Sequence, residues 1–415
     1  MSEHRDNINP AYLGLQKIAG VAGVVGLAIV GLYWMRDADT AWASYQYGYI
    51  FWTLVSVAGL CWLMVHHLVA GRWGFMTQRV FEAQARLLPL MALLFLPLLL
   101  NLGVYPWRDP TSITWPDPQT ATHVQEIVQN KVLWLNTKFW ILRSVLYFAL
   151  WCGLGYFLLS WSRKLDATGD RSILSKLTLT SGFGILFSVL AVTFAAVDWT
   201  MSLEPEWYSS IYGLYYLIGG GLTAIAFAIV FLTYHCDRAP LAKRYQTDHL
   251  QHLGTIMLGF TILWAYVSFS QFLIIWSANL PEEIPFYLKR TDSGLNVIAI
   301  FLMVGHFWLP FLLLLQRRVK RSTFNIRNMC YFILAMRVLD FFWVLKPATV
   351  HPGEPFPWNL VWLDAAAFIG VGGIWFCAFI WAIQKAPLLV NDPRMIDAFA
   401  KDLPHDHHEV TEHAS

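Results

Sequence analysis

The sequence predicts an all-α polytopic membrane protein with ten transmembrane helices, arranged as two pseudo-symmetric four-helix bundles plus two peripheral helices. Three observations predict this fold: the composition, ten apolar runs, and a phrase that occurs twice. Of the 415 residues, 57% are hydrophobic and 13% are charged, whereas soluble domains carry about 25% charged residues. This composition excludes an ordinary soluble protein. The net charge of +2 gives no reason to expect a nucleic-acid partner.

Ten apolar runs approach the roughly 20 residues that a helix needs to cross a bilayer. They lie near residues 15–35, 47–69, 87–105, 134–160, 175–197, 211–235, 253–279, 294–315, 326–346 and 358–383. An even number of spans places both termini on the same side of the membrane.

The loops between these runs differ in their content of Lys and Arg. One set holds about 15 of these residues and the opposite set about 6. Because cytoplasmic loops carry the excess of positive charge, we expect both termini to be cytoplasmic. The polar start of the chain lacks the pattern of a cleaved secretory signal, so we expect the first span to remain in the mature protein.

A repeated phrase suggests that the chain is internally duplicated. Residues 198–205 and 340–347 both read Asp, then Leu five positions on and Pro seven positions on, and each closes an apolar run. The second and sixth spans also begin alike, with Tyr47-Gly48 and Tyr212-Gly213. A four-helix unit repeated in one direction predicts two bundles related by an axis along the membrane normal. The alternative is a chance match between short aromatic boundary segments that end in Pro.

The duplication divides the chain into five parts. Residues 1–46 form a cytoplasmic N-terminus and the first span, 47–205 the first bundle, 206–347 the second bundle, 348–390 the tenth span, and 391–415 a cytoplasmic tail. The loop near 106–133 is rich in Pro and Trp, which suits either a docking surface for another subunit or a lid over its own helices. We expect the chain after Pro387 to be a solvated tail.

Ionisable residues in the extracytoplasmic half are the first candidate site. A charge at the bilayer centre costs about 2.5 to 3.5 kcal/mol, so such residues are normally paired or face a polar cavity. They suit a proton path, but structural ion pairs and helix-to-helix hydrogen bonds are open alternatives. The candidates are Asp198, His306, Arg337, Asp340, Asp364 and Arg143.

A second group lies in the cytoplasmic half, where the alternative is a set of solvated helix ends. These candidates are His66, His67, Glu82, Asp248 and His249. Polar residues of the seventh span would link the two halves, together with water: Ser268, Ser270 and Gln271. Only Asp340 has an arginine three residues before it, since Ala195 stands at that offset before Asp198. If only one bundle carries a proton path, we therefore expect it to be the second bundle.

Several kinds of chemistry lack their sequence motifs. The five cysteines stand singly, which excludes a local iron–sulfur ligand set or a c-type haem attachment site. A haem held by His66 or His67 with His235 would lie near the membrane boundary, without a second deep pair to carry electrons onward. No phosphate-binding loop, nucleophile motif or metal motif is present. We expect no catalytic residue and no metal site.

Four motifs resemble a known family. They are residues 198–212, Val80-Phe-Glu-Ala83, Leu102-Gly-Val-Tyr-Pro-Trp107, and Arg337-x-x-Asp340-x-x-Trp343. Together they resemble the NrfD/PsrC-type integral membrane subunits over essentially the whole chain, and most closely the ActF-type subunits of bacterial alternative complex III. They separate this family from other ten-span proteins more sharply than they separate ActF-type from ActC-type paralogues.

The resemblance implies a subunit of a quinol:electron-acceptor (cytochrome c) oxidoreductase in a bacterial inner membrane. It implies that haem c and iron–sulfur clusters belong to partner subunits and that this chain has no redox centre, with quinone, quinol or lipid as its candidate ligands. The implied partners are an NrfD-like quinol-oxidising paralogue, an iron–sulfur protein, multihaem cytochromes c and a terminal oxidase. Proton half-channels are then the expected role. A purely structural anchor and an independent secondary transporter are the alternatives.

Overall fold

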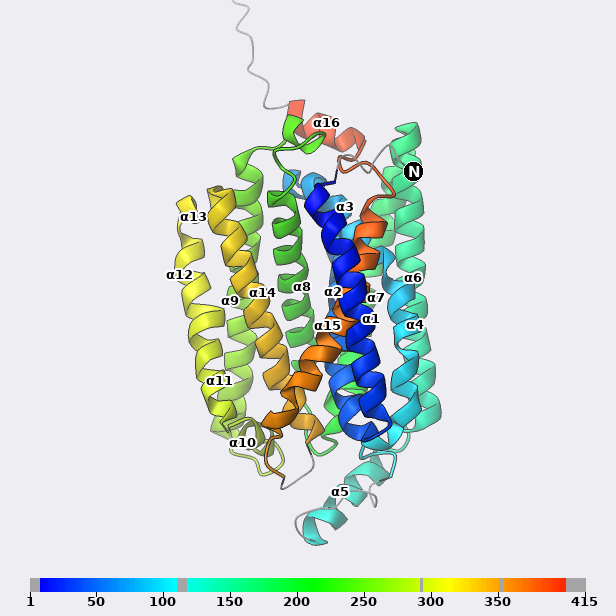
Figure 1. The fold of residues 1–415 in the computed structure, drawn as a ribbon, viewed down its shortest axis with the longest axis vertical. Helices are drawn as coiled ribbons and strands as arrows, with labels where there is room; N and C mark the ends of the chain where they lie inside the picture. Colours follow the sequence, from blue (N-terminus) through cyan, green and yellow to red (C-terminus); the bar gives the residue numbers. More distant parts are fainter. Residues whose placement is uncertain (1–7, 110–117, 292–293, 351–353, 401–415) are drawn as a thin grey trace, which may run out of the picture.

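The computed structural model describes residues 8–109, 118–291, 294–350 and 354–400. Within these ranges the chain is helical and has no strand, and the long helices run side by side along one axis (Figure 1). Nine helices of the described part are long and apolar enough to cross a membrane, and a bent pair makes up to ten. The protein is therefore a multi-pass membrane protein, and the all-α prediction is confirmed.

Most predicted spans are single helices. They are α1 (Pro10–Trp34), α2 (Ala38–Val69), α6 (Thr137–Thr168), α7 (Ser172–Trp199), α8 (Tyr212–Thr233), α9 (Thr247–Ala278), α14 (Thr323–Leu345) and α15 (Val361–Ile383). The eighth span consists of α11 (Leu295–Leu302), a π-helical turn at Met303–Trp308, and α12 (Leu309–Leu315). Four short helices lie between or beyond them: α5 (Pro118–Asn130), α10 (Pro285–Thr291), α13 (Arg317–Arg321) and α16 (Pro393–Ala400).

The third span differs from the prediction of one helix over 87–105. It consists of α3 (Arg72–Arg86), α4 (Leu88–Leu94) and a 3₁₀ helix, η2 (Leu96–Val104), with a bend of 50° before η2. Pro89 and Pro97 stand in the first turns of α4 and η2, where proline's missing N–H is tolerated but a continuous helix is interrupted. The polar helix α3 is buried, so it is part of the bundle and not a solvated loop.

Two helices, α2 and α8, form the centre of the bundle. Almost all of α8 is buried, while α1 and α9 expose apolar side chains that suit contact with lipid. The first and tenth spans pack on each other at glycines: a Cβ on Gly26 would lie 2.5 Å from the Ala366 oxygen and 2.8 Å from the Gly370 Cα. Small residues allow this close approach. The division into two duplicated bundles stays a prediction.

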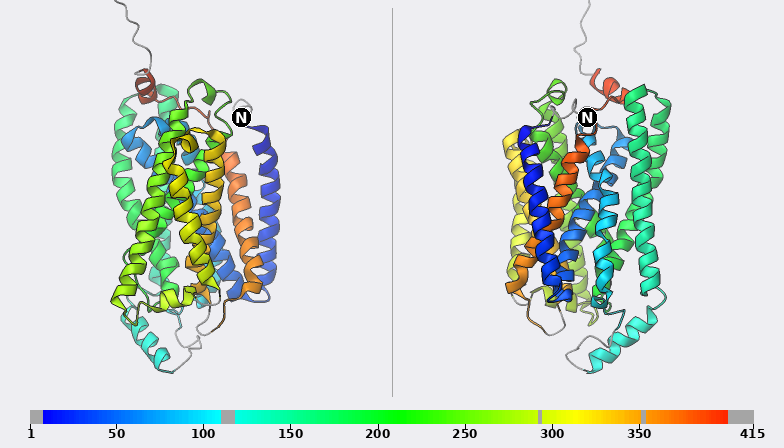
Figure 2. Two further views of the ribbon diagram at one scale, coloured as in Figure 1. Left: turned by 90° about the vertical axis from the view of Figure 1, so that its left-hand side faces the viewer. Right: turned by 45° about the vertical axis from the view of Figure 1, so that its right-hand side comes forward.

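The described ends of the chain lie at the same end of the bundle. Figure 2 shows the start of α1 and the helix α16 together, with α5 at the opposite end. We call these the α16 end and the α5 end. Which of them faces the cytoplasm stays a prediction from the Lys and Arg distribution.

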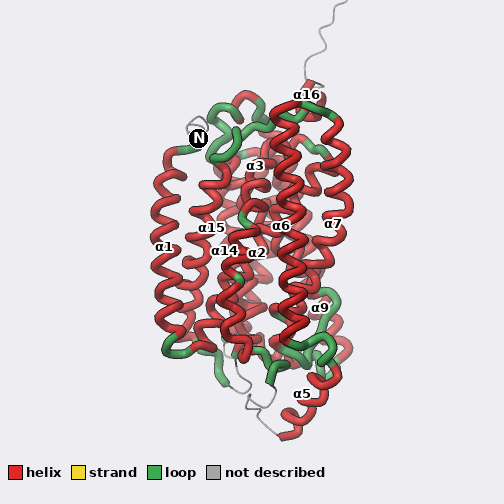
Figure 3. The backbone as a smooth tube through the Cα atoms, turned by 90° about the vertical axis from the view of Figure 1, so that its right-hand side faces the viewer, coloured by secondary structure: helices red, strands yellow, loops and turns green. Residues whose placement is uncertain are grey.

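The expected solvated tail after Pro387 is wrong for its first part. Leu388, Val390, Asp392 and Met395 are buried, and α16 lies over the α16 end of the bundle (Figure 3) beside α3. The Asn391 backbone N–H donates to Asp166 of α6 at 3.0 Å. The chain turns back over the bundle because its apolar side chains are buried there and its backbone oxygens accept hydrogen bonds from the bundle. Residues 401–415 lie outside the described residues.

Candidate functional site

Asp198 lies in the last turn of α7 and is fully buried. Its carboxylate accepts two hydrogen bonds from Arg143 of α6, from Nε at 2.7 Å and from Nη2 at 2.8 Å. The Tyr147 hydroxyl donates at 2.7 Å and the Trp134 indole N–H at 3.0 Å. A two-pronged arginine contact with two further donors satisfies a buried carboxylate.

Asp340 lies in α14 and is also buried. It pairs with Arg337, one turn earlier on the same helix, and accepts from the Tyr215 hydroxyl of α8. The Trp264 indole N–H of α9 donates at 3.2 Å. The guanidinium of Arg337 also donates from Nε to the Thr223 hydroxyl at 3.4 Å.

The two aspartates therefore receive the same three kinds of donor: an arginine, a tyrosine and a tryptophan. The arginine three residues before Asp340 suggested that the partners of the two aspartates are not matched, and this is wrong, because Arg143 reaches Asp198 from a neighbouring helix. An offset along one helix cannot reveal a partner that lies on another. The basis for preferring the second bundle as the proton path is thereby removed.

His306 lies in the π-helical turn and is 1% exposed. Within the described part of the chain neither of its ring nitrogens has a hydrogen-bond partner. Its ring lies against the Trp264 indole, with 3.9 Å between ring centroids, so Trp264 separates His306 from Asp340. Because π-helical turns occur frequently at functional sites, this orphaned imidazole is the strongest single sign of function in the bundle.

Asp364 is not part of the Asp340 cluster. It pairs instead with Lys346 at 2.8 Å, and both side chains are buried. Lys346 stands six residues after Asp340 in the repeated phrase, at the place that Glu204 occupies after Asp198. The alignment points to Glu204, which the sequence analysis did not include among the candidate residues.

Glu204 forms an ion pair with Arg290 at 2.8 Å, with Lys289 further away at 3.8 Å. Burial raises the pKa of Glu204, but the charges of Arg290 and Lys289 outweigh it and hold the pKa below its usual value. The repeated phrase thus carries opposite charges at one position, each with a buried partner of the other sign. The phrase itself was the signal for Glu204, since it contains this residue.

At the α16 end, Glu82 is the centre of a buried network. Arg79 donates to its Oε2 at 2.7 Å, and Gln78 and Ser162 donate to Oε1 at 2.9 Å and 2.5 Å. His66 Nε2 lies 3.2 Å from the Gln78 amide oxygen, and it donates to this oxygen when the ring carries its proton on Nε2. The structure therefore brings Glu82 and His66 together through Gln78.

The other candidates of this half lie apart from that network. The His67 backbone oxygen accepts from Arg394 at 3.1 Å, and the exposed Asp248 pairs with Arg321 at 2.9 Å. His249 caps the start of α9 through Gln246. Asp248 and His249 both contribute to a helix start, but only Asp248 is solvated as the alternative interpretation expected, because His249 is buried.

The proposed link along α9 is only partly polar. Gln271 is buried and Ser270 is half-buried. The Ser268 hydroxyl is also buried, and it has no partner among the described residues. No hydrogen bond within the described residues joins these three side chains to the Asp340 or Glu82 clusters.

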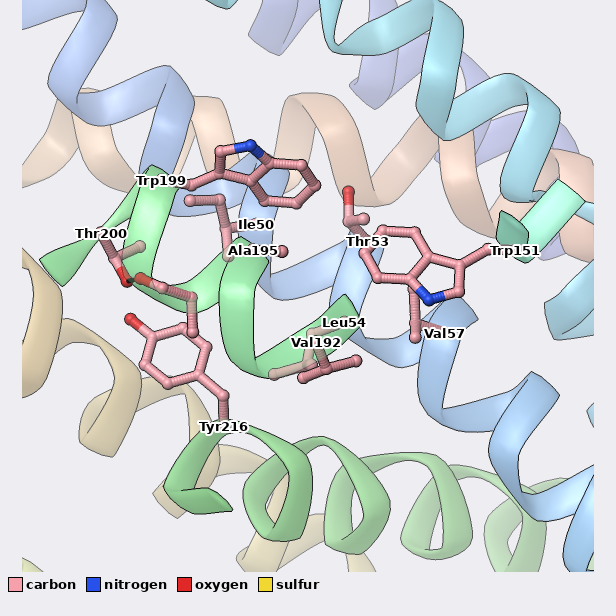
Figure 4. Close-up of a pocket in the computed structure, with 11 residues that line it drawn as sticks. Ile50, Thr53, Leu54, Val57, Trp151, Val192, Ala195, Trp199, Thr200 and Tyr216 are labelled. Atoms are coloured by element: carbon pink, nitrogen blue, oxygen red, sulfur yellow. Dashed lines mark hydrogen bonds between the residues drawn. The ribbon is translucent and has the colours of Figure 1, made fainter. Parts of the chain in front are cut away.

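A small cavity lies among α2, α6, α7 and α8 (Figure 4). Two of the residues that line it are sequence neighbours of residues in the two aspartate sites. Its lining includes Trp199, which follows Asp198, and Tyr216, which follows Tyr215. Its volume of about 20 Å³ has room for one water. The surface that lines it is apolar, and a buried water needs 2–4 polar partners, so this conformation offers no hydrated link there.

The histidine needed for the haem interpretation already has partners. His235 accepts from the Asn9 backbone N–H at 3.1 Å, and its Nδ1 lies 2.8 Å from the Phe231 oxygen. Burial lowers the pKa of His235 to about 4. Nε2 therefore anchors the start of α1 to the end of α8, while Nδ1 contacts the last turn of α8.

Comparison of the sequence with models of known protein families and with curated proteins gives no match.

Proposed function

We propose that this protein is the ActF-type membrane subunit of an alternative complex III, a quinol:cytochrome c oxidoreductase of the bacterial inner membrane. In this proposal the chain has no redox centre of its own and contributes two proton half-paths. The observation that carries the proposal is the placement of buried carboxylates at both ends of one helical bundle, each among side chains that donate hydrogen bonds to it. The four family motifs support the choice of complex.

The half-path at the α5 end would use Asp340, Arg337 and His306, with Asp198 and Arg143 as the matching site. A carboxylate held by a guanidinium can take up a proton only when the pair opens. Arg337 has a second acceptor in the Thr223 hydroxyl. This hydroxyl would hold the guanidinium by a hydrogen bond when the ion pair with Asp340 opens. His306, with both nitrogens free within the described residues, would accept the proton next, and because Trp264 lies between His306 and Asp340 this step requires Trp264 to move or a water to enter.

The half-path at the α16 end would use Glu82 with His66. Gln78 contacts both and holds them in one hydrogen-bonded set, and because an amide does not carry a proton, transfer between His66 and Glu82 would need a water beside it. Arg79 holds Glu82 on one side and Asp166 on the other. No hydrogen bond within the described residues joins the two half-paths, and the small cavity near the aspartates is apolar, so the link requires a rearrangement or water entry.

The helix α5 supports contact with another subunit. It projects beyond the bundle at one end (Figures 1 and 2), and this favours a docking surface over a lid in the loop near 106–133, of which residues 110–117 lie outside the described part. The haem c and iron–sulfur subunits of the proposed complex are candidate partners there.

Proton release and quinol oxidation should separate in two variants. We expect Asp340→Asn and His306→Phe, in the intact complex in liposomes, to reduce the protons released per quinol while the complex still assembles. Asp248→Asn is the matched control, because its carboxylate is exposed and only pairs with Arg321. Full proton stoichiometry with normal turnover in both variants would make these residues structural.

A structural anchor is the second candidate, and a specific observation favours it. Four buried acids each have a cationic partner: Glu82 with Arg79, Asp198 with Arg143, Asp340 with Arg337, and Asp364 with Lys346. Breaking a buried pair by removing one partner costs about 3–5 kcal/mol. If the variants lose stability and not proton release, the anchor is the better function. An independent transporter would purify without cytochrome partners.

A further inference from the structure

A large cavity lies between α1, α8, α14 and α15, with one wall on α2. Its volume of about 560 Å³ is within the range of roughly 300–1,000 Å³ typical of ligand sites. In Figure 1 α15 runs obliquely, close to α14 towards the α5 end and close to α1 towards the α16 end. The wall of the cavity is mostly apolar and includes Phe51, Trp52, Phe227, Phe231, Leu334 and Val338.

One end of the cavity is polar, and a cation lies next to it, against one of the lining residues. The Tyr331 hydroxyl donates to the Tyr234 hydroxyl at 3.1 Å, and both residues line the cavity with Tyr12. The Arg327 guanidinium lies over the Tyr234 ring, 4.5 Å from its centroid. Arg327 is half-buried and forms no ion pair with any described residue. A cation that has no ion pair among the described residues lies next to hydroxyl groups at the end of an apolar cavity. This arrangement is complementary to a molecule with an anionic head group and a long apolar chain.

We propose that this cavity binds one anionic phospholipid. Its phosphate lies at Arg327 and the tyrosine hydroxyls, and an acyl chain follows α8 inward from Tyr234 to Thr223. These residues are eleven positions apart, which corresponds to about 16 Å of helix. Thr223 lines the cavity and accepts from Arg337. The end of the acyl chain therefore lies beside the Asp340 site.

The polar groups favour a phospholipid over an isoprenoid quinone. A quinone head needs hydrogen-bond donors at its carbonyls, but at the inner end the Thr223 hydroxyl already donates to the Gly219 oxygen at 2.8 Å. At the outer end the dominant group is a cation. A basic residue near the membrane surface attracts an anionic lipid with about 1 kcal/mol. The charge of the site thus selects the phosphate.

Lipid retention in two variants tests the proposal. The full-length protein is reconstituted in nanodiscs with equal amounts of phosphatidylglycerol and phosphatidylcholine plus isoprenoid quinone, extracted in mild detergent, and analysed by native mass spectrometry. Ala335→Trp places an indole in the cavity and should reduce retained phosphatidylglycerol by about tenfold. Arg327→Gln should reduce the preference for phosphatidylglycerol over phosphatidylcholine by about fivefold.

Two controls match these variants. Ala149 is exposed on α6, away from the cavity, and Arg318 is exposed on α13 at the same end as Arg327. Ala149→Trp and Arg318→Gln should retain phosphatidylglycerol like the unaltered protein, and the thermal stability of all four variants identifies any that unfold. Equal retention in Ala335→Trp and Ala149→Trp would overturn the proposal. So would retention of quinone in place of phosphatidylglycerol, or an equal preference for the two phospholipids in the unaltered protein.

Discussion

Asp198 and Asp340 show how the same local chemistry is built from different helices. Arg143 reaches Asp198 from α6, whereas Arg337 reaches Asp340 along its own helix. In a bilayer each unpaired charge is costly, so a buried acid must find a cation wherever the packing offers one. This requirement explains why the donor types agree although their positions in sequence do not.

Gly219 is the residue that makes space for Arg337. A Cβ at this position would lie 2.1 Å from Nη2 of Arg337. We expect Gly219→Val to displace the guanidinium from Asp340 and to destabilise the protein by more than the 1–3 kcal/mol or so of ordinary overpacking. Unfolding in detergent, followed by circular dichroism, measures the change.

A glycine in open surroundings provides the control for that substitution. Gly14 of α1 is exposed, and a Cβ on it would have no atom within 4 Å. Gly14→Val should therefore change stability far less than Gly219→Val. Equal effects in the two variants would show that helix propensity, and not the contact with Arg337, determines the result.

At the scale of elements, the contact between α1 and α8 depends on a neutral histidine. His235 Nε2 must be unprotonated to accept from the Asn9 N–H. Burial and the nearby Arg238 lower its pKa, against the opposing effects of the Phe231 oxygen and Asp237, to about 4. The usual value is about 6.5, so the detached state binds more protons between these two pH values.

The contact should therefore be strongest above about pH 6.5 and weaken as the pH falls towards about 4, by at most about 1.4 kcal/mol for each pH unit. Hydrogen exchange at residues 9–12, compared between neutral and mildly acidic buffer, measures this loss. In His235→Gln, which cannot titrate, the protection of the same amides, corrected for the pH dependence of the intrinsic exchange rate, should be independent of pH over this range. A pH dependence that persists in His235→Gln would contradict the assignment.

Helix existence was more predictable than helix shape. The run at 87–105 predicted a third span, but the structure extends it to Arg72 and bends it by 50°. The polar residues 72–86 read as a loop because Glu82 and Arg79 look solvated when taken singly. They are buried because Gln78, Ser162 and Asp166 satisfy them, and those partners come partly from another helix.

At the scale of the whole molecule, the shared location of the two chain ends makes a topology prediction. The α16 end carries most of the loop Lys and Arg, so we expect it in the cytoplasm and α5 outside. Green fluorescent protein fused after Ser415 should fluoresce, and alkaline phosphatase fused after Asn130 in a truncated chain should be active. Exchanging the two reporters is the control. Inactive phosphatase after Asn130 would contradict this orientation.

The sequence by itself determined that the chain is helical and crosses the membrane many times, because polar backbone and charge are costly to expose to lipid and a long apolar run therefore forms a helix. It also marked many of the buried ionisable groups, but not Arg79, Arg290 or Lys346. Only the tertiary structure decided which of these groups meet: Arg143 with Asp198, Lys346 with Asp364, and His306 with Trp264 and no hydrogen-bond partner among the described residues. The physical reason is that an apolar run fixes one helix, whereas an ion pair or a cavity depends on how separate helices rotate and cross.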